Sequence, residues 1–300
     1  MYAEGGQREF GAEREIILCA GALQSLQLLQ LSGIGPADHL RSLSLPVVCD
    51  SPGVGANLRD HWGLRLQYRL LRSGGHNPRL RGAGLWMSAL RYLVCGTGVL
   101  SSAAAEVGAF IKATPGASRP DAELQISPLS VVPATGQIER RPGLQCTVRS
   151  LRPESRGTAM IRSADPTAPP AIRGNFLSAE YDRELTVHMV RYARRLLRQP
   201  PLREYLGDET FPGSGYRSPQ EIVGVCRRAE SPGSHFAGTC RMGQDRMAVV
   251  DPTLRVRGVA GLRVVDCSIM PTLVSGNTNG PIMAIAWRAA DMILAESSHR

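Results

Sequence analysis

Several features are scarce in this sequence of 300 residues, and each absence narrows the classes of function. Lys112 is the only lysine, so almost all the positive charge behind the net value of +9 is arginine. Aromatic residues make up 5% of the chain, which is few for a surface that stacks nucleic-acid bases. No apolar run is long enough to span a bilayer, and the opening MYAEGGQREF lacks the pattern of a signal peptide. We therefore expect a cytoplasmic protein without a transmembrane segment.

Standard site motifs are also missing. The seven cysteines are scattered and form no CxxC pair, and the spacing of Cys226, His235 and Cys240 fits no usual zinc pattern, so no metal site is expected. There is no GxSxG elbow, no Walker loop and no HExxH. The segments GIGPAD (33–38) and GVGANL (53–58) lack the third glycine of a dinucleotide loop, and we interpret both as turns.

The densest run of positive charge, RYARRLLRQP (191–200), is the best candidate for a nucleic-acid contact. The periodicity of an α-helix would place its arginines on one face and its apolar residues on the inward face. That pattern is typical of a solvated amphipathic helix, so no nucleic-acid partner is expected. The arginines concerned are Arg191, Arg194, Arg195 and Arg198, and the inward residues are Val190, Leu196 and Leu197.

The first part of the chain has the order of an α/β fold. REIILC (14–19) is a continuous apolar run that predicts a parallel strand buried on both faces. Ser25 is a plausible N-cap for a helix that ends at Leu31, before SGIGP. A short helix (ADHLRSL) and a strand (LPVVCD) follow. Strand, helix, helix and strand in this order predict an α/β unit.

The middle of the chain differs from both ends. Short alternating runs predict an antiparallel sheet, with one helix near LWMSALRYLV and another over 181–198. Near the C-terminus, GLRVVDCSI (261–269) predicts a buried strand, and 280–295 predicts a helix with one apolar stripe. The alternating runs are LRLQYRLL, AEVGAFIKA, DAELQISPL and LQCTVRSL, and the stripe consists of Ile282, Ile285, Ala289, Met292 and Ile293.

Four segments carry a family resemblance when taken in this order. They are GALQSLQLLQLSGIG (21–35), PGVGANLRDH (52–61), SHFAGTCRMG (234–243) with the following 248–271, and SGNTNGP (275–281). Together they resemble the glucose–methanol–choline oxidoreductases, the flavin-dependent alcohol oxidases and dehydrogenases, in a choline dehydrogenase-like form. The resemblance extends over essentially the whole chain and is densest at both ends.

The resemblance implies a fold of α/β plus α+β class. Residues 1–60 would form part of an FAD-binding, Rossmann-like domain, and residues 231–300 would return to that domain with the catalytic residues. Residues 61–230 would form a substrate-binding domain built on an antiparallel sheet. Members of the family oxidise the CH–OH group of a small alcohol and pass hydride to FAD.

The resemblance also assigns the site. Alcohol oxidation needs a base for the hydroxyl proton, histidine is the natural base near neutral pH, and His235 stands at the family's base position. Asn277 stands where the family carries Asn or a second His, and its amide could donate to the substrate oxygen. Ser234, Asp266, Cys267, Asn277 and Thr278 match flavin-contacting positions. From the residues alone, His235 could equally be structural, Asn277 a helix-capping turn residue, and Asp266 a turn residue at a strand end.

One departure from the family is large. Its members open with a strand, a GxGxxG loop and a helix that hold the ADP half of FAD, and no such unit occurs in this sequence. The opening residues resemble the middle of a full-length member, so we expect an N-terminally truncated fragment, or a chain whose N-terminal half another chain supplies. A non-catalytic remnant or one subunit of a split enzyme is the alternative. No motif identifies the alcohol or the electron acceptor.

Overall fold

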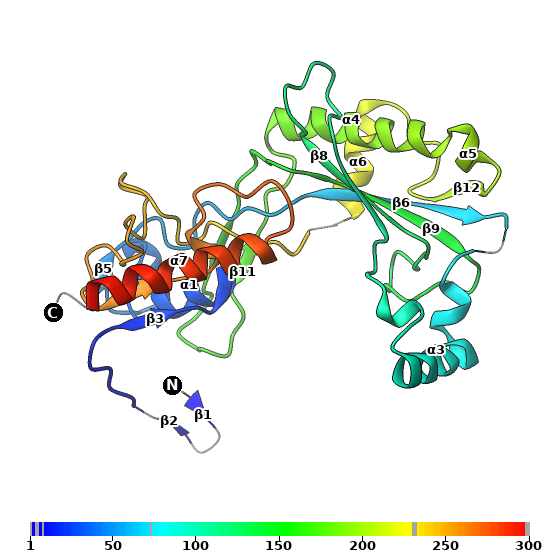
Figure 1. Cartoon of the computed structure of the whole chain (residues 1–300). Coiled ribbons are helices and arrows are strands. Elements are labelled where there is room, and N and C mark those ends of the chain that lie inside the picture. The colour runs from blue at the N-terminus through cyan, green and yellow to red at the C-terminus, as the bar shows by residue number, and fades with distance from the viewer. Residues whose placement is uncertain (1, 4–5, 8, 73, 230–232, 298–300) are drawn as a thin grey trace. The chain divides into compact units, whose positions relative to one another are not determined.

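The computed structural model describes residues 2–3, 6–7, 9–72, 74–229 and 233–297 (Figure 1). The chain divides into two compact units. The first comprises Met1–Asp60, Arg156–Asn175 and His235–Arg300, and the second comprises His61–Ser155 and Phe176–Ser234.

The first unit combines short parallel strand pairs with three helices. Strand β3 (Ile16–Leu18) pairs in parallel with β13 (Leu262–Val264), and β4 (Ile34–Gly35) pairs in parallel with β5 (Cys49–Asp50). The helices are α1 (Gly21–Leu31), α2 (Ala37–Ser42) and α7 (Asn279–Ser297). Two antiparallel pairs complete the unit: β1 (Tyr2–Ala3) with β2 (Gly6–Gln7), and β10 (Thr158–Met160) with β11 (Ala171–Arg173).

Strand β3 corrects the prediction of a strand buried on both faces. Ile16 is 52% exposed and Ile17 is 41% exposed. The strand has one neighbour, β13, in a two-stranded sheet. Burial on both faces of a parallel strand needs covering layers as well as flanking strands, and the described residues leave the outer side of β3 open.

The start of α1 also differs from the prediction. The helix begins at Gly21 and not after Ser25, which lies inside it and is fully buried. Gly21 has a φ of +80°, a conformation that glycine adopts without strain, and it allows the chain to turn sharply out of β3. The face that α1 buries includes the polar Ser25 and Gln30, whereas Leu28 is 45% exposed. Apolar packing of Leu26 and Leu29 and the tertiary hydrogen bonds of Ser25 and Gln30 together hold this face of α1 inward.

The segment Arg156–Asn175 belongs to the first unit, although it falls inside the range 61–230 assigned above to a substrate-binding domain. The backbone N–H of Ala159 donates to the carbonyl of Gly55, and Leu58 and Gly157 exchange two backbone hydrogen bonds. The Gln30 side chain of α1 accepts from the backbone N–H of Ile161 at 2.9 Å. These contacts join residues about 100 or more positions apart in sequence and leave no trace in a local pattern.

The second unit is built on a five-stranded antiparallel sheet in the order β12-β6-β9-β8-β7. Four strands confirm the alternating runs: β6 (Gly63–Leu70), β7 (Val107–Ile111), β8 (Ala122–Ser127) and β9 (Gly143–Ser150). The fifth, β12 (Leu206–Phe211), was not predicted, because LGDETF carries two acidic residues. In the structure this strand pairs with β6 with shifts in register. The remaining elements are α3 (Gly82–Cys95), α4 (Glu180–Leu197), α5 (Pro200–Arg203), α6 (Pro219–Ala229) and the 3-10 turns η1 (Asn77–Leu80) and η2 (Val99–Ser101).

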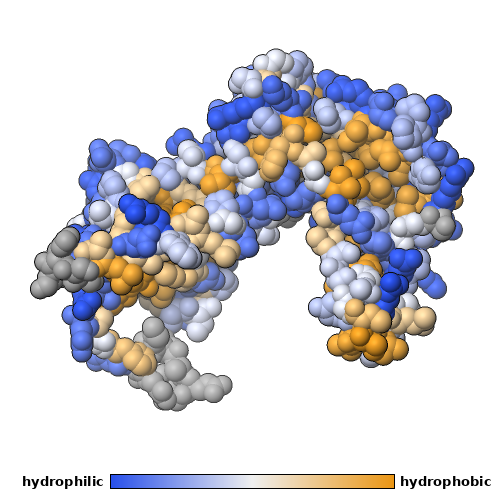
Figure 2. All heavy atoms as spheres, viewed as in Figure 1, coloured by the Kyte–Doolittle hydropathy of each residue, from blue (hydrophilic) through white to orange (hydrophobic). Residues whose placement is uncertain are grey.

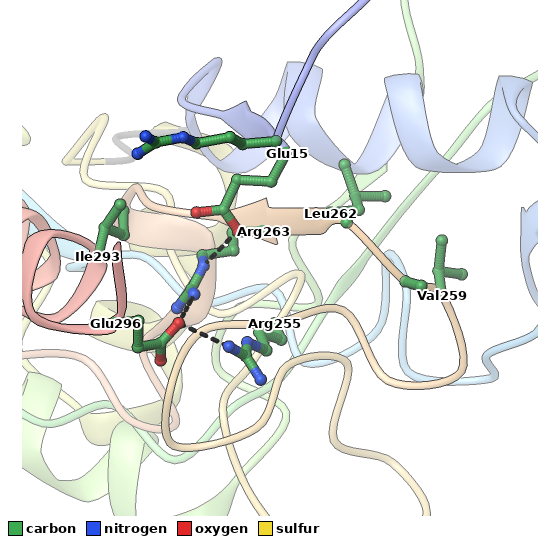
Figure 3. A pocket seen from close by; sticks show the side chains of 10 residues that line it. Glu15, Arg255, Val259, Leu262, Arg263, Ile293 and Glu296 are labelled. Atoms are coloured by element: carbon green, nitrogen blue, oxygen red, sulfur yellow. Dashed lines mark hydrogen bonds and ion pairs between the residues drawn. The ribbon is translucent and has the colours of Figure 1, made fainter. Parts of the chain in front are cut away.

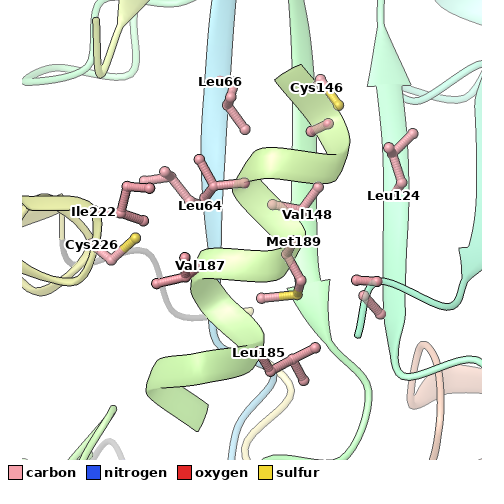
Figure 4. Packing of buried hydrophobic residues seen from close by; sticks show 14 of the residues in the cluster. Leu64, Leu66, Leu124, Cys146, Val148, Leu185, Val187, Met189, Ile222 and Cys226 are labelled. Atoms are coloured by element: carbon pink, nitrogen blue, oxygen red, sulfur yellow. The ribbon is translucent and has the colours of Figure 1, made fainter. Parts of the chain in front are cut away.

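Helix α4 covers one face of this sheet and carries the core of the unit (Figure 4). Leu64, Leu66 and Val148 point from the strands toward Leu185 and Met189 of α4, and all five are 1% exposed or less. Each buried aliphatic side chain of this size contributes about 1.5–3 kcal/mol. The sheet and α4 are therefore held together mainly by apolar burial.

One arginine of the 191–200 run is not solvated. Arg194 is buried, and its guanidinium donates to both carboxylate oxygens of Glu209 at 2.9 and 2.7 Å and to the carbonyls of Tyr216 and Gly213. The other three arginines are exposed, and Val190 and Leu197 face inward as predicted. The prediction of one fully solvated arginine face is thus wrong at Arg194, because β12 brings a carboxylate against α4.

Among the described residues, no helix is both long enough and apolar enough to cross a membrane. In the same part of the chain, no three His, Cys, Asp or Glu side chains converge as ligands for a metal ion.

Candidate active site

The parallel pair of β3 and β13 brings two chain segments to one edge of the first unit. The strands pair in register from Ile16 opposite Leu262 to Leu18 opposite Val264, so their carboxyl ends lie together. In open α/β sheets, ligands bind beyond the carboxyl ends of the strands. The turn from β3 into α1 and the turn at 265–267 after β13 therefore mark the candidate site.

Asp266 joins these two turns. It is 6% exposed, and its Oδ2 accepts hydrogen bonds from the Gly21 backbone N–H at 2.9 Å and the Ser25 hydroxyl at 2.5 Å. Its Oδ1 accepts from the Ser268 backbone N–H at 2.8 Å, which caps the 3-10 turn η3 (Cys267–Ile269). Three donors compensate the carboxylate for its lost hydration. Asp266 consequently fixes the start of α1 against the end of β13.

His235 stands on a segment whose backbone is held by the 57–60 region. Its backbone N–H donates to Oδ1 of the buried Asp60 at 2.8 Å. Two residues further, the N–H and C=O of Ala237 pair with those of Arg59, each at 3.0 Å. His235 itself is half-buried. The backbone of the His235 segment is therefore held in place by its hydrogen bonds to Arg59 and Asp60.

Gly238 is required where this segment passes closest to Asn57. It has a φ of +86°. A Cβ there would lie 2.7 Å from two atoms of Asn57, the side-chain nitrogen Nδ2 and the backbone carbonyl oxygen. The Asn57 amide donates to the carbonyl of Gly238 at 3.1 Å. Only glycine permits this approach, which explains the glycine in SHFAGTCRMG.

The same segment then runs beside η3, next to Asp266. Every second residue of this segment donates a backbone hydrogen bond to one of the three consecutive carbonyls of η3, so the segment that carries His235 lies directly against the turn that follows β13. The bonds run from Gly238 N to Cys267 O (3.2 Å), from Cys240 N to Ser268 O (2.9 Å) and from Met242 N to Ile269 O (2.7 Å).

The start of α7 is packed onto these segments by a small apolar cluster. Ala237, Met270 and Leu273 are buried together, and Ile282 and Ile285 of α7 pack against them. This cluster positions the SGNTNGP loop, which ends at the first turn of α7. The sequence-predicted stripe on α7 is confirmed, since its members are the less exposed residues of the helix.

The predicted site residues are distributed over this arrangement as follows. Asp266 and Cys267 form the turn after β13, and burial raises the pKa of the Cys267 thiol. Asn277 is exposed and Thr278 is half-buried, just before α7, and the Thr278 carbonyl accepts from Ile282 N at 3.0 Å. Ser234 is exposed, with a φ of +61°, and is the last residue of the second unit.

A cavity of about 630 Å³ lies in another part of the first unit and contains none of the predicted site residues (Figure 3). Arg263, whose side chain is 3% exposed, donates to Glu15 at 2.7 Å and also bonds Glu296, which pairs with Arg255. The hydrogen bond from Arg263 holds the pKa of Glu296 below its usual value. Every carboxylate shown in this cavity has an arginine partner, which is the pattern of a structural joint between β13 and α7.

Sequence reasoning missed two residues of the site. Asn57 and Asp60 hold the segment of His235, yet PGVGANLRDH attracted notice for its glycines and for the family resemblance. The available signal was the pair of polar side chains directly after a turn. Their partners lie 181 and 175 residues away and could not be read from the sequence.

Comparison with known proteins places this geometry in a family. Two family models described as GMC oxidoreductase match residues 2–63 and 153–286, and together they take in more than half of the chain. The chain is 39% identical over 282 residues to an oxygen-dependent choline dehydrogenase of Klebsiella pneumoniae subsp. pneumoniae, covering 94% of this chain and 51% of that protein. It is 37% identical over 293 residues to that of Burkholderia multivorans, covering 97% and 52%.

Two solved oxidase structures are also similar to this chain. A mutant formate oxidase of Aspergillus oryzae RIB40, studied for FAD modification, superimposes with a TM-score of 0.87 at 26% identity and covers 96% of this chain and 55% of its own. Pyridoxine 4-oxidase from Mesorbium loti gives a TM-score of 0.76 at 28% identity, with 92% and 50% covered. The chain thus spans about half the length of the curated relatives it matches. On these matches and the site geometry, the chain belongs to the GMC oxidoreductase family.

Proposed function

We propose that this chain is part of an FAD-dependent oxidoreductase that acts on the CH–OH group of a small alcohol. One observation carries the proposal: the segment of His235 lies hydrogen-bonded beside the Asp266 turn, at the carboxyl edge of a parallel strand pair. The choline dehydrogenase relatives and the formate oxidase neighbour support the same class of chemistry.

The residues at this edge suit a flavin. Its ribityl hydroxyls and the N–H and C=O groups of its ring need acceptors and donors, which Asp266, Thr278 and the Asn277 amide offer. Ser234 and Cys267 complete the proposed contacts. The 19-residue helix α7 begins directly after Thr278, and the partial positive charge at its N-terminus favours an electron-rich ring edge. When bound, FAD would supply the acceptor for hydride.

In this proposal His235 is the general base. An imidazole titrates close to neutral pH, so it can take the hydroxyl proton of an alcohol as the C–H bond breaks. The hydrogen bond from its backbone to Asp60 keeps the base in place. The Asn277 amide donates to the alcohol oxygen, where negative charge develops, and this favours the transition state over the bound alcohol.

The two units would have different roles, FAD binding and alcohol binding. The first would hold FAD in a Rossmann-like arrangement and includes 156–175 in addition to 1–60 and most of 231–300. The second would bind the alcohol on its five-stranded sheet.

A second candidate function is suggested by the exposed apolar side chains of the first unit. Ile16, Ile17, Met283, Trp287 and Leu294 are 41–76% exposed on β3 and α7. An apolar surface of this kind is typical of an interface. A GxGxxG-containing part of the enzyme would cover this surface, and β3 and α7 would then serve as its binding face.

The test is reconstitution with a separately expressed GxGxxG-containing N-terminal half of a relative. We expect the pair to retain FAD and to reduce it anaerobically with a small alcohol, choline being the first to try. His235→Ala should slow this reduction by about 10²- to 10⁴-fold at unchanged flavin content. His39→Ala is the matched control, because His39 is also half-buried but bonds the carbonyl of Ile161, and its rate should stay normal. Flavin reduction unaffected by His235→Ala would refute the assignment.

A further inference from the structure

The five-stranded sheet of the second unit has one face that α4 does not cover. Side chains alternate between the two faces of a strand, and directly opposite residues of neighbouring strands share a face. Leu64, Leu66 and Val148 point to α4, and Figure 2 shows hydrophobic surface where Figure 1 has α4 lying against β6 and β9. The residues that alternate with them in sequence therefore form the second face, which is the one left for a ligand.

This second face is polar. The register of β6, β9, β8 and β7 aligns two adjacent rows of residues across it. Together the rows hold two guanidinium groups, one carboxylate, one hydroxyl and one amide. The first row is Gly63, Arg149, Glu123 and Phe110, and the second is Arg65, Thr147, Gln125 and Gly108.

Arg65 and Arg149 bring two like charges together in these rows. A Cβ on Gly63 would lie 2.7 Å from Cγ of Arg149, so the stem of Arg149 lies over this glycine of β6. Burial lowers the pKa of the Arg65 guanidinium, and the positive charge of Arg149 lowers it further. Nε of Arg65 is buried and has no hydrogen-bond partner among the described residues. A desolvated guanidinium beside a second cation is unfavourable, and an anion placed between the two would relieve both costs.

The neighbouring carboxylates do not neutralise this pair. Glu123 shares the row of Arg149, but its Oε1 accepts from Nε2 of Gln125 at 2.8 Å, and no ion pair of the described residues joins Glu123 to Arg149 or Arg65. Nη1 of Arg149 donates to Oε1 of the same Gln125 at 3.0 Å, so its acceptor there is a neutral oxygen. Two carboxylates farther along the strands have partners of their own: Glu139 pairs with Arg69 at 2.9 Å and Glu106 with His76 at 2.7 Å.

There is also room beside the two arginines. A Cβ on Gly108, at the end of the row of Arg65, would meet nothing closer than the carbonyl oxygen of Leu124 at 3.9 Å. The face thus offers two guanidinium groups, a net positive charge and open space in the same rows.

We propose that the alcohol oxidised by this enzyme carries an anionic group, a carboxylate or a phosphate, that binds Arg65 and Arg149 on this face of the sheet. The inference rests on the proposed function, in which the second unit binds the alcohol on its sheet. A guanidinium donates two parallel hydrogen bonds to a carboxylate or phosphate group. The same pair of arginines repels a cation, so it disfavours an alcohol with a quaternary ammonium group such as choline.

The anion site is tested first on the 300-residue chain by itself, without flavin. Ligand-observed NMR titrations at low ionic strength compare 4-hydroxybutanoate and 2-hydroxyethyl phosphate with the neutral butane-1,4-diol and with choline. We expect the anions to bind with a dissociation constant of about 1 mM, and the diol and choline to bind at least about 10-fold more weakly. The tighter of the two anions identifies the group as carboxylate or phosphate.

Arginine variants locate the binding. Arg65→Gln and Arg149→Gln should each weaken anion binding about 10-fold or more, and Arg65→Lys, which keeps the charge but loses the planar fork, should weaken it less. Arg191→Gln is the matched control, because it removes an exposed arginine from α4, on the covered side of the sheet, and should leave binding unchanged. Far-UV circular dichroism verifies folding. Equal binding of the anions and the diol, or an equal effect of Arg191→Gln, would overturn the proposal.

Flavin reduction in the reconstituted enzyme then tests whether the anion belongs to the substrate. The ratio of kcat/KM for the better anion to that for butane-1,4-diol should exceed about 10. Arg65→Gln should bring this ratio toward 1, whereas a variant that only lost stability or flavin would slow both alcohols alike and keep the ratio. Reduction by choline or the diol as fast as by the anions would overturn the inference and leave the proposed function standing. Absence of reduction by every alcohol would refute the proposed function, and the NMR titration would still decide the anion site.

Discussion

Replacing Asp266 by asparagine should loosen the edge of the first unit where the candidate site lies. The carboxylate uses both oxygens: Oδ2 accepts from Gly21 and Ser25, and Oδ1 accepts from Ser268. Asparagine offers one acceptor oxygen and one NH₂ group of nearly the same shape. Whichever way the amide turns, one N–H or O–H donor then faces another donor in a buried place.

The expected cost follows from these contacts. If the amide oxygen faces Gly21 and Ser25, the buried Ser268 N–H loses its acceptor, which costs about 1–3 kcal/mol. The two remaining hydrogen bonds lose their charge assistance, which costs about 1 kcal/mol more. We therefore expect Asp266→Asn to lower the free energy of opening around η3 by about 2–4 kcal/mol.

Native-state hydrogen exchange, read by mass spectrometry on peptides covering 16–31 and 262–270, measures this directly. Amides of these peptides should exchange about 30- to 1000-fold faster in Asp266→Asn, whereas the core of the second unit should be unaffected. This local readout avoids assuming that a chain of two units unfolds in one step.

Asp251→Asn is the matched control within the same unit. Asp251 accepts from the backbone N–H groups of Thr253 and Arg255 and from the Thr253 hydroxyl, all through Oδ1. An asparagine oxygen can replace that single acceptor, so the cost should stay below about 1 kcal/mol. If the two variants behaved alike, or if Asp266→Asn exchanged at the normal rate, the account of Asp266 as the link between α1 and β13 would be wrong.

Three further outcomes are expected. Expressed alone, the 300-residue chain should purify without stoichiometric FAD, because it contains no GxGxxG loop, and a preparation with one flavin per chain by visible absorbance would contradict this. In the reconstituted enzyme, Asn277→Ala should slow flavin reduction about 10²-fold in stopped-flow measurements, and Asn277→His should restore part of the rate; a normal rate in fully flavinated Asn277→Ala would leave Asn277 a turn residue. Arg194→Ala should destabilise the second unit by about 3–5 kcal/mol in urea unfolding, since it strands the buried Glu209 carboxylate, whereas exposed Arg195→Ala should cost less than about 0.5 kcal/mol.

Elements with a strong local pattern could be predicted from the sequence. The alternating runs gave four strands of the sheet, and the helical periodicity of 181–198 and 280–295 gave α4 and α7, because alternation and periodicity act within a few residues of chain. The order of the motifs led to the GMC oxidoreductase family, which the comparisons confirm. His235, Asn277 and the flavin-contacting positions came from that resemblance and stay predictions.

Contacts between distant residues were decided by the tertiary structure alone. Ser25 was expected to cap a helix, because serine commonly does so, but a carboxylate 241 residues further along the chain holds it inside α1. Arg194 was expected in solvent, and Glu209 on an unpredicted strand buries it. In both cases a local preference of less than about 2 kcal/mol competes with a charge-assisted hydrogen bond in a dry interior.

The same distinction applies to α3. Its amphipathic pattern determined that a helix would form and which side chains would share its apolar face. The sequence would place that face inward, as in most helices of globular proteins. The close contact of Gly84 with Pro78 and the hydrogen bond of Ser88 fix the helix by its small side instead. Sequence thus determined the helix and its faces, and only the tertiary structure decided which face meets the outside, because orientation depends on contacts with a neighbouring element.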